Sequence, residues 1–198
     1  MSTRPSLREQ TRRAVKDHVA QAAWGLFARQ GFEATTVNQI AEAAGMSYRS
    51  FFRYFEGKDG LLLERLLESG GLVVQALEER PAGEAPWPAL RAALDEVVCL
   101  QEKHPDRTRE VLTMFREPAV SAILLERQRR WQAMLAPLVL RRLAHDAGDP
   151  VGLACASALA GCAVACLDAA SEAWITQPGL DLRGVLTETM SAVAPLGP

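Results

Sequence analysis

The sequence predicts an all-α protein of about nine helices, in two parts that join near residue 57. Apolar residues recur every three to four positions along most of the chain, and no stretch alternates apolar and polar residues as a half-buried strand does. Glycine and proline interrupt this pattern and mark the loops between helices. The 198 residues are 48% apolar and 23% charged, which is typical of soluble globular proteins and allows one large domain or two small ones.

The first predicted helix runs from Thr11 to Gln30, and Gly31 ends it. Its apolar residues share one face and comprise Val15, Val19, Ala22, Ala23, Leu26 and Phe27. This stripe predicts that the helix packs against the elements that follow it.

The second and third predicted helices are short and lie close together. Thr36 and Gln39 have the spacing of a capping box, so we expect a helix to begin at Thr36. Gly45 ends it in a position that favours a left-handed backbone. Ser47 caps the third helix, which we expect to reach Phe55.

The remaining helices are longer. They are predicted at residues 58–79, 89–103, 106–116, 119–145 with a kink near Pro137, 150–176 and 182–193. Residues 151–167 carry no charge, but a membrane span needs roughly 20 strongly apolar residues. This run is short and rich in small residues, so we expect a tightly packed soluble helix.

Charge is distributed unevenly along the chain. Residues 1–55 contain eight basic and four acidic residues, so their net charge is +4. The whole chain has a net charge of −2, so the other 143 residues have a net charge of −6. The N-terminus is polar and basic and has no apolar signal segment, so we expect a cytoplasmic protein. A basic first quarter on an acidic body is typical of a nucleic-acid-binding head on a non-binding trunk.

Residues 36–55 form two short helices around a glycine turn, which is the pattern of a helix-turn-helix motif. At 100° per residue, Phe51 and Phe55 face the other helices. The opposite face carries Arg49, Ser50, Arg53 and Tyr54, with Tyr48 in the exposed first turn and Phe52 at the border. This outer face contains no carboxylate, so we interpret it as the surface that contacts DNA.

The residues predicted to contact DNA are Thr35, Thr36, Ser47, Tyr48, Arg49, Ser50, Phe52, Arg53, Tyr54 and Lys58. The alternatives are a solvated face for the arginines, rim packing for the tyrosines and a capping role for Thr36. The N-terminal arginines either reach the DNA or belong to an inert tail; they are Arg4, Arg8, Arg12 and Arg13.

The stretch "GFEATTVNQIAEAAGMSYRSFFRYFEGKDGLL" resembles the DNA-binding head of the TetR family of bacterial repressors. The resemblance covers roughly residues 10–65. It implies a DNA-binding domain over 1–57 and a ligand-binding and dimerisation domain over 58–198. It also implies a homodimer that binds a palindromic operator and responds to a small ligand. Three residues depart from the family: Phe52 replaces a usual Tyr, Met46 a usual Val or Ile, and Gly60 a usual acid.

The trunk resembles a TetR subgroup whose trunks are described as acyl-CoA-like ligand-binding domains. Bulky or flexible residues that we expect in a ligand pocket, with ordinary core packing as the alternative, are Leu66, Met114, Phe115, Trp131, Met134 and Trp174. The small residues of the helix at 150–176 predict close packing within the chain, or, as the resemblance favours, with the same helix of a second copy.

Two functions from other classes are also compatible with parts of the sequence. Cys155, Cys162 and Cys166 share one helical face, which allows a redox sensor, whereas no cysteine and histidine spacing predicts a metal site. An architectural DNA-binding protein without ligand is the other alternative. No enzyme motif and no cofactor motif is present, so we expect neither an enzyme nor a cofactor.

Overall fold

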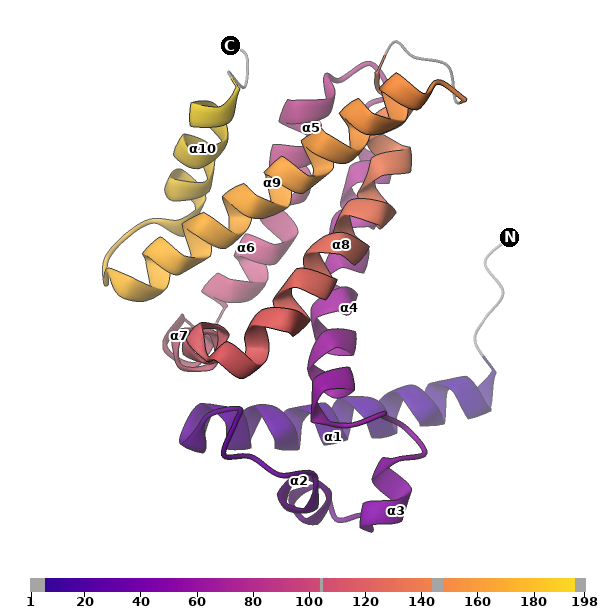
Figure 1. The fold of residues 1–198 in the computed structure, drawn as a ribbon, viewed down its shortest axis with the longest axis vertical. Helices are drawn as coiled ribbons and strands as arrows, with labels where there is room; N and C mark the ends of the chain where they lie inside the picture. The colour runs from indigo at the N-terminus through magenta and orange to yellow at the C-terminus, as the bar shows by residue number, and fades with distance from the viewer. Residues whose placement is uncertain (1–5, 104, 144–147, 195–198) are drawn as a thin grey trace. The chain divides into compact units, whose positions relative to one another are not determined.

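The computed structural model describes residues 6–103, 105–143 and 148–194, and Arg4 lies outside this part. The chain divides into two compact units. Unit 1 comprises residues 6–65 and 110–123, and unit 2 comprises the remaining described residues. The described residues form ten α-helices and one 3-10 helix and include no strand, so the all-α prediction is confirmed (Figure 1). The predicted boundary at residue 57 stays a prediction.

Unit 1 holds the helix-turn-helix motif. It contains α1 (Leu7–Gln30), α2 (Val37–Ala43), α3 (Tyr48–Phe51) and the first part of α4 (Lys58–Glu79). A later segment of the chain joins this unit with the end of α7 (Pro105–Thr113), the 3-10 helix η1 (Met114–Arg116) and the start of α8 (Pro118–Leu140).

Unit 2 is a helical bundle built from the rest of α4, the start of α7, most of α8 and four further helices. These are α5 (Pro86–Ala93), α6 (Asp95–Glu102), α9 (Pro150–Thr176) and α10 (Leu182–Val193). The two C-terminal helices, α9 and α10, lie side by side, and α9 also packs on α5 (Figure 1).

The helix boundaries differ from the sequence prediction at several points. The helix expected at 119–145 ends at Leu140, because residues 141–143 form a turn, and the last turn of the helix expected at 106–116 is the 3-10 helix η1. The first helix begins at Leu7, four residues early, because Ser6 caps it in a capping box with Glu9. The helix expected at 89–103 is two helices, α5 and α6, that meet at Leu94. The third helix is one turn long rather than ending at Phe55, because residues 52–54 form a turn.

The core of unit 1 is aromatic. Phe27, Phe32, Phe51 and Phe55 are at most 6% exposed, and Ile40 of α2 is fully buried. Phe27 lies 5.1 Å from Phe32, and Phe51 lies 5.4 Å from Phe55, measured between ring centroids. The predicted docking side of the third helix, Phe51 and Phe55, is therefore confirmed. Helix α2 packs against α1 and α3 packs against α2, and burial of these large rings stabilises the unit.

A close contact in unit 2 joins α4 to α8. Trp131 is 1% exposed, and its indole N–H donates to the carbonyl of Leu66 at 3.1 Å. A Cβ atom added to Gly70 would lie 2.4 Å from the indole nitrogen of Trp131. Glycine is therefore favoured at this position, because a side chain here would displace the indole.

One helix, α9, is long and apolar enough to cross a membrane by length and composition. The core helix of a soluble protein passes the same test, so this finding alone is weak evidence for a span. In this chain α9 is packed on α5 and α10, and its buried residues include Ala156, Ala160 and Ala163.

Candidate nucleic-acid interface

The helix-turn-helix motif is built as its capping residues predict. Thr36 accepts a hydrogen bond from the amide of Gln39, and the side chain of Gln39 accepts one from the amide of Thr36. Gly45 has φ of +65°, which a glycine adopts without strain. Ser47 accepts from the amide of Ser50 at 3.1 Å and starts α3. These local contacts fix the turn and set the direction of α3.

The outer face of α3 is exposed. Tyr48 is 54% exposed and Phe52 is 45% exposed, and their rings meet edge to face with centroids 4.9 Å apart. Arg49 and Arg53 are exposed, and neither forms an ion pair with a described residue. The guanidinium of Arg53 lies 5.8 Å from the ring of Tyr54. Phe52, which the sequence placed at the border, therefore belongs to the exposed surface with Tyr48.

Two of the residues predicted to contact DNA have another role. Thr35 is 1% exposed, and its hydroxyl donates to the carbonyl of Gly31 at 2.7 Å. The ammonium of Lys58 donates to the carbonyls of three residues at 2.7, 3.1 and 2.9 Å, namely Phe32, Glu33 and Thr35. Three hydrogen bonds use all the donors of an ammonium group. We therefore leave Thr35 and Lys58 out of the interface. Thr35 lies in the loop between α1 and α2, and Lys58 binds this loop from the first turn of α4.

Glu117 also binds this loop, through its backbone amides. One carboxylate oxygen accepts from the amide of Phe32 at 2.8 Å, and the other accepts from the amide of Glu33 at 2.8 Å. The loop is therefore clamped by Lys58 through its carbonyls and by Glu117 through its amides. We call this arrangement the loop clamp. Nothing in the sequence indicated it, because Glu117 is 85 residues away from Phe32.

Residues 20–64 match the family described as bacterial regulatory proteins, tetR family, and residues 84–197 match the MftR C-terminal domain. The chain belongs to the TetR family of transcriptional regulators. Proteins of this family regulate transcription by binding DNA and are not enzymes, which accords with the absence of an enzyme motif from the sequence.

Three known proteins illustrate the similarity. The HTH-type transcriptional regulator TcmR of Streptomyces glaucescens is 34% identical over 152 residues, covering 73% of this chain and 67% of TcmR. A mycofactocin biosynthesis regulator of Mycobacterium tuberculosis, MftR, is 25% identical over 193 residues, covering 92% of this chain and 90% of MftR. The solved structure of the fatty acid degradation regulator FadR from Bacillus halodurans has a TM-score of 0.62 at 16% identity, covering 98% of this chain and 97% of FadR. At that identity it shows a shared fold alone.

The trunk of this TetR-family protein contains a buried arginine that was not among the residues predicted from the sequence. Arg127 is 5% exposed, and its Nη2 donates to Asp168 of α9 at 2.6 Å. Its guanidinium lies 5.3 Å from the ring of Trp131. Its Nε atom is buried and has no hydrogen-bond partner. A buried polar group without a protein partner is rare, and such groups bind an ordered water, an ion or another bound molecule.

The residues predicted to line a ligand pocket divide between the two units. Met114 and Phe115 belong to unit 1, whereas the other four belong to unit 2. Within unit 2, Leu66, Trp131 and Met134 meet around Gly70. Trp174 is 3% exposed, and the guanidinium of Arg109 lies 4.2 Å from its ring. Trp131 and Trp174 are thus buried in unit 2, and each has an arginine guanidinium beside its ring.

The cysteines have contrasting surroundings, and no metal-binding cluster occurs among the described residues. Cys155 and Cys162 are exposed on α9. Cys166 is buried, and this burial, together with the nearby Cys162, raises the pKa of its thiol. A raised pKa leaves less of the reactive thiolate at neutral pH, so Cys166 is unsuited to rapid oxidation.

Proposed function

We propose that this TetR-family regulator is a repressor that binds a palindromic operator as a homodimer and releases it when a small ligand binds the trunk. The observation that carries the DNA-binding face is the outer side of α3. There Arg49 and Arg53 are exposed without a carboxylate partner, next to the hydroxyl-bearing Tyr48 and Ser50. Arginine can bind the guanine edge in the major groove through two hydrogen bonds.

The proposed interface is the set Thr36, Ser47, Tyr48, Arg49, Ser50, Phe52, Arg53 and Tyr54. Arg49→Ala should relax base preference at one operator position by about 1–3 kcal/mol if Arg49 binds a base. Arg29 is an exposed arginine at the end of α1, so Arg29→Ala is a control with the same charge change. Equal losses on all sequences from Arg49→Ala would refute the base contact.

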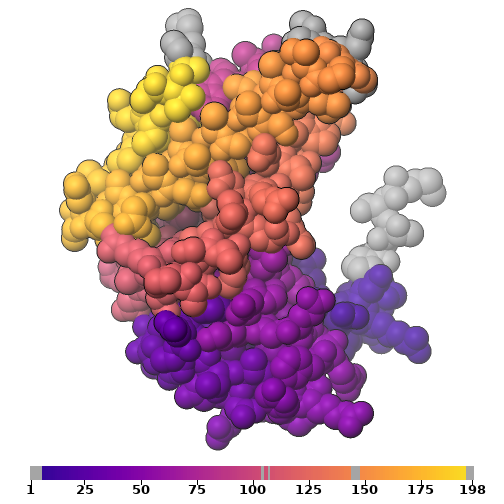
Figure 2. Space-filling view, in the orientation of Figure 1, coloured from indigo at the N-terminus to yellow at the C-terminus, as the bar shows by residue number. Residues whose placement is uncertain are grey.

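A stripe on α9 supports the homodimer. Exposed residues recur along the helix in steps of four and three, and most are small: Val151, Cys155, Ala158, Cys162, Ala165 and Ala169. This is the spacing of a seam between two paired helices. Figure 2 shows α9 and α10 uncovered along the same face of the molecule. We propose that they pair with the same two helices of a second copy.

The mass of the protein in solution tests the dimer. Ala165→Glu places a charge in the stripe and should convert the dimer to a monomer. Ala133 is an exposed alanine of α8, so Ala133→Glu makes the same change outside the stripe and should leave the dimer intact. A wild-type protein that is monomeric at micromolar concentration would exclude this proposal.

Two features of the trunk support a class of ligand. The buried Nε of Arg127 is a donor without an acceptor, and Trp131 provides an apolar surface beside it. A lipophilic molecule with one carbonyl, such as an acyl-CoA thioester, would satisfy both. The resemblance of the trunk to acyl-CoA-like ligand-binding domains points to the same class, and FadR is named as a regulator of fatty acid degradation.

Thermal unfolding with dodecanoyl-CoA tests this assignment, with free CoA and dodecanoate as controls. Dodecanoyl-CoA at 100 times its Kd should stabilise the wild type by about 2.7 kcal/mol. Arg127→Met, which keeps the length of the side chain, should reduce this shift. A shift of the same size in Arg127→Met would refute the role of Arg127.

Helix α4 is the element that we propose transmits the ligand signal. It begins at Lys58 in the loop clamp and carries Gly70 in contact with Trp131. A ligand that binds one trunk conformation would shift α4 and change the distance between the two copies of α3. Half-sites lie about 34–36 Å apart, so a shift of a few Å removes contacts. Such coupling is typically about 1–3 kcal/mol.

Two alternatives have distinct tests. A redox sensor would use Cys155 or Cys162, the exposed cysteines of the α9 stripe, and a variant without both would lose its response to oxidant. An architectural protein would coat DNA, whereas a repressor would protect one or a few palindromes in a footprint. We place the protein in the cytoplasm, where its operator is found.

A further inference from the structure

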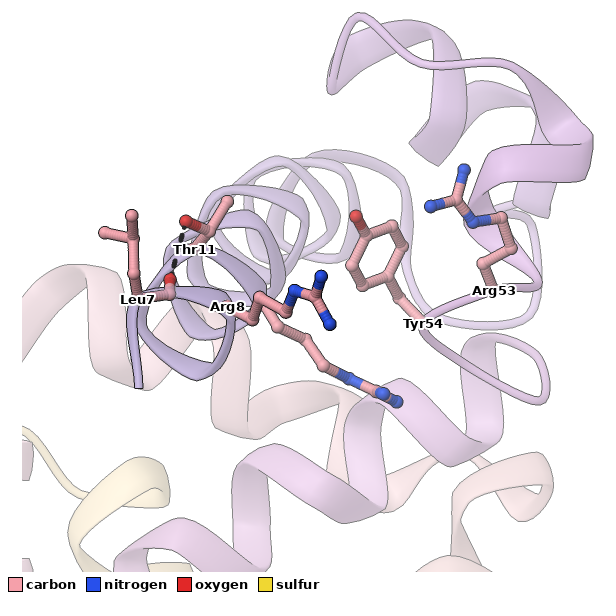
Figure 3. A pocket seen from close by; sticks show the side chains of 6 residues that line it. Leu7, Arg8, Thr11, Arg53 and Tyr54 are labelled. Carbon is pink, nitrogen blue, oxygen red and sulfur yellow. Dashed lines mark hydrogen bonds between the residues drawn. The ribbon is translucent and has the colours of Figure 1, made fainter. Parts of the chain in front are cut away.

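A basic cavity lies beside the recognition helix, between α1 and the turn that follows α3. Its volume is about 540 Å³, and its lining comprises Leu7, Arg8, Thr11, Arg12, Arg53 and Tyr54. Figure 3 shows Arg8 on the α1 side and Arg53 on the other, with the ring of Tyr54 between them. The cavity therefore brings together residues that are more than 40 positions apart in sequence.

The charge of this cavity is uncompensated. Three of its six lining residues are arginines, and no carboxylate is among them. Within the described part of the chain, Arg8, Arg12 and Arg53 form no ion pair. Guanidinium groups stay protonated at any physiological pH, so the three charges repel one another unless an anion enters. The cavity is thus suited to a negatively charged group.

The donors in the cavity fit a phosphate. The guanidinium groups have the planar geometry that binds two phosphate oxygens at once, and the Tyr54 hydroxyl can donate a further hydrogen bond. Thr11 is not available as a donor, because its hydroxyl donates to the carbonyl of Leu7 at 2.9 Å (Figure 3). Leu7 is 78% exposed and gives the cavity an apolar rim.

We propose that this cavity binds a backbone phosphate of the operator, next to the groove that α3 enters. The inference rests on the proposed DNA-binding function. Arg53 and Tyr54 lie in the turn of residues 52–54 that follows α3, so a phosphate held here belongs to the DNA strand that borders α3. The first two turns of α1 thereby join the interface through Arg8 and Arg12. A phosphate contact carries no base information, so its contribution is equal for all sequences.

The salt dependence of DNA binding by the full-length protein tests the proposal. The affinity falls as salt rises, so the slope of log K against log salt is negative. Arg12→Gln should make this slope less steep by about 0.9, the value for one phosphate contact. Between about 50 and 200 mM salt the affinity of the wild type should therefore fall about 3.5-fold more than that of the variant. Arg8→Gln should act in the same direction. The effect should be equal on the operator and on a scrambled duplex.

Arg13→Gln is the matched control. Arg13 is the next residue on α1 and is exposed, but it does not line the cavity. The proposal expects a larger fall in slope for Arg12→Gln than for Arg13→Gln. Equal changes in both variants would mean that only the total positive charge of the DNA-binding unit matters, and would overturn the proposed phosphate site.

Two further outcomes separate the inference from the proposed function. A wild-type protein that binds no duplex would overturn both. If Arg12→Gln weakens the binding of inorganic phosphate but leaves the DNA slope unchanged, the cavity is a site for a free anion, and the assignment to the DNA backbone is wrong.

Discussion

Replacement of Lys58 distinguishes a structural role from a DNA contact. Lys58→Met keeps most of the side chain and removes the ammonium that donates to three carbonyls of the loop. The bond to the carbonyl of Glu33 is exposed, so water can replace it. The bonds to Phe32 and Thr35 are partly buried, and a hydrogen bond to a charged group contributes about 1.5–3 kcal/mol. We therefore expect a loss of about 3 kcal/mol in the free energy of unfolding.

Two assays measure the consequences of this change. Urea unfolding should show the stability loss, which corresponds to a fall in Tm of about 6–12 °C for a chain of this size. The salt slope of DNA binding, measured where the variant is folded, should not change. Lys103→Met removes an exposed lysine and should be neutral in both assays. A stability loss below about 0.5 kcal/mol together with a slope lower by about 0.9 would restore Lys58 to the DNA interface.

Four further substitutions test contacts seen in the structure. Gly70→Ala should destabilise the protein by about 1–2 kcal/mol, because the overpacking against the Trp131 indole outweighs the gain in helix propensity. Gly71→Ala, which meets nothing within 4 Å, should stabilise it by about 1 kcal/mol. Glu117→Ala should cost about 2 kcal/mol, because two amides of the loop lose a carboxylate acceptor. Asp168→Ala should cost about 2 kcal/mol, because it leaves Arg127 buried without a counter-charge. This loss is smaller than for a fully buried pair, because the side chain of Asp168 is 42% exposed. Urea unfolding measures all four changes.

A different result would contradict each of these predictions. Equal effects of alanine at Gly70 and Gly71 would mean that the indole moves aside without cost. Glu117→Gln keeps one acceptor oxygen, so a loss equal to that of Glu117→Ala would show that the second hydrogen bond contributes nothing. The double variant Arg127→Met with Asp168→Ala should recover part of the stability, because it removes the unpaired charge. A further loss in the double variant would contradict the explanation.

The sequence predicted best the features that depend on neighbouring residues. The capping box of Thr36 and the glycine turn at Gly45 follow from local hydrogen bonding and backbone freedom, and both are confirmed. The burial of Phe51 and Phe55 follows from helical spacing and is also confirmed. The length of α3 was overestimated, because the spacing of these two rings is the same whether residues 52–54 form a helix or a turn.

Contacts across long separations were not predictable from one sequence. Lys58 and Glu117 meet the loop at Phe32 from 26 and 85 residues away. In sequence Lys58 is a lysine at a helix start, which suits a phosphate contact as well as a loop contact. Arg127 lies in the run "ERQRRW", which has the composition of a solvated helix face. Only the fold shows that this arginine, among its charged neighbours, points into the trunk.

The central claim is that the exposed face of α3 recognises a palindromic DNA sequence. Selection of bound duplexes from a random pool, with the purified full-length protein, tests it most directly. We expect the wild type to enrich one palindrome, and Arg49→Ala to show a relaxed base preference at one position in each half-site. A folded, dimeric wild-type protein that enriches no sequence would refute DNA recognition by α3.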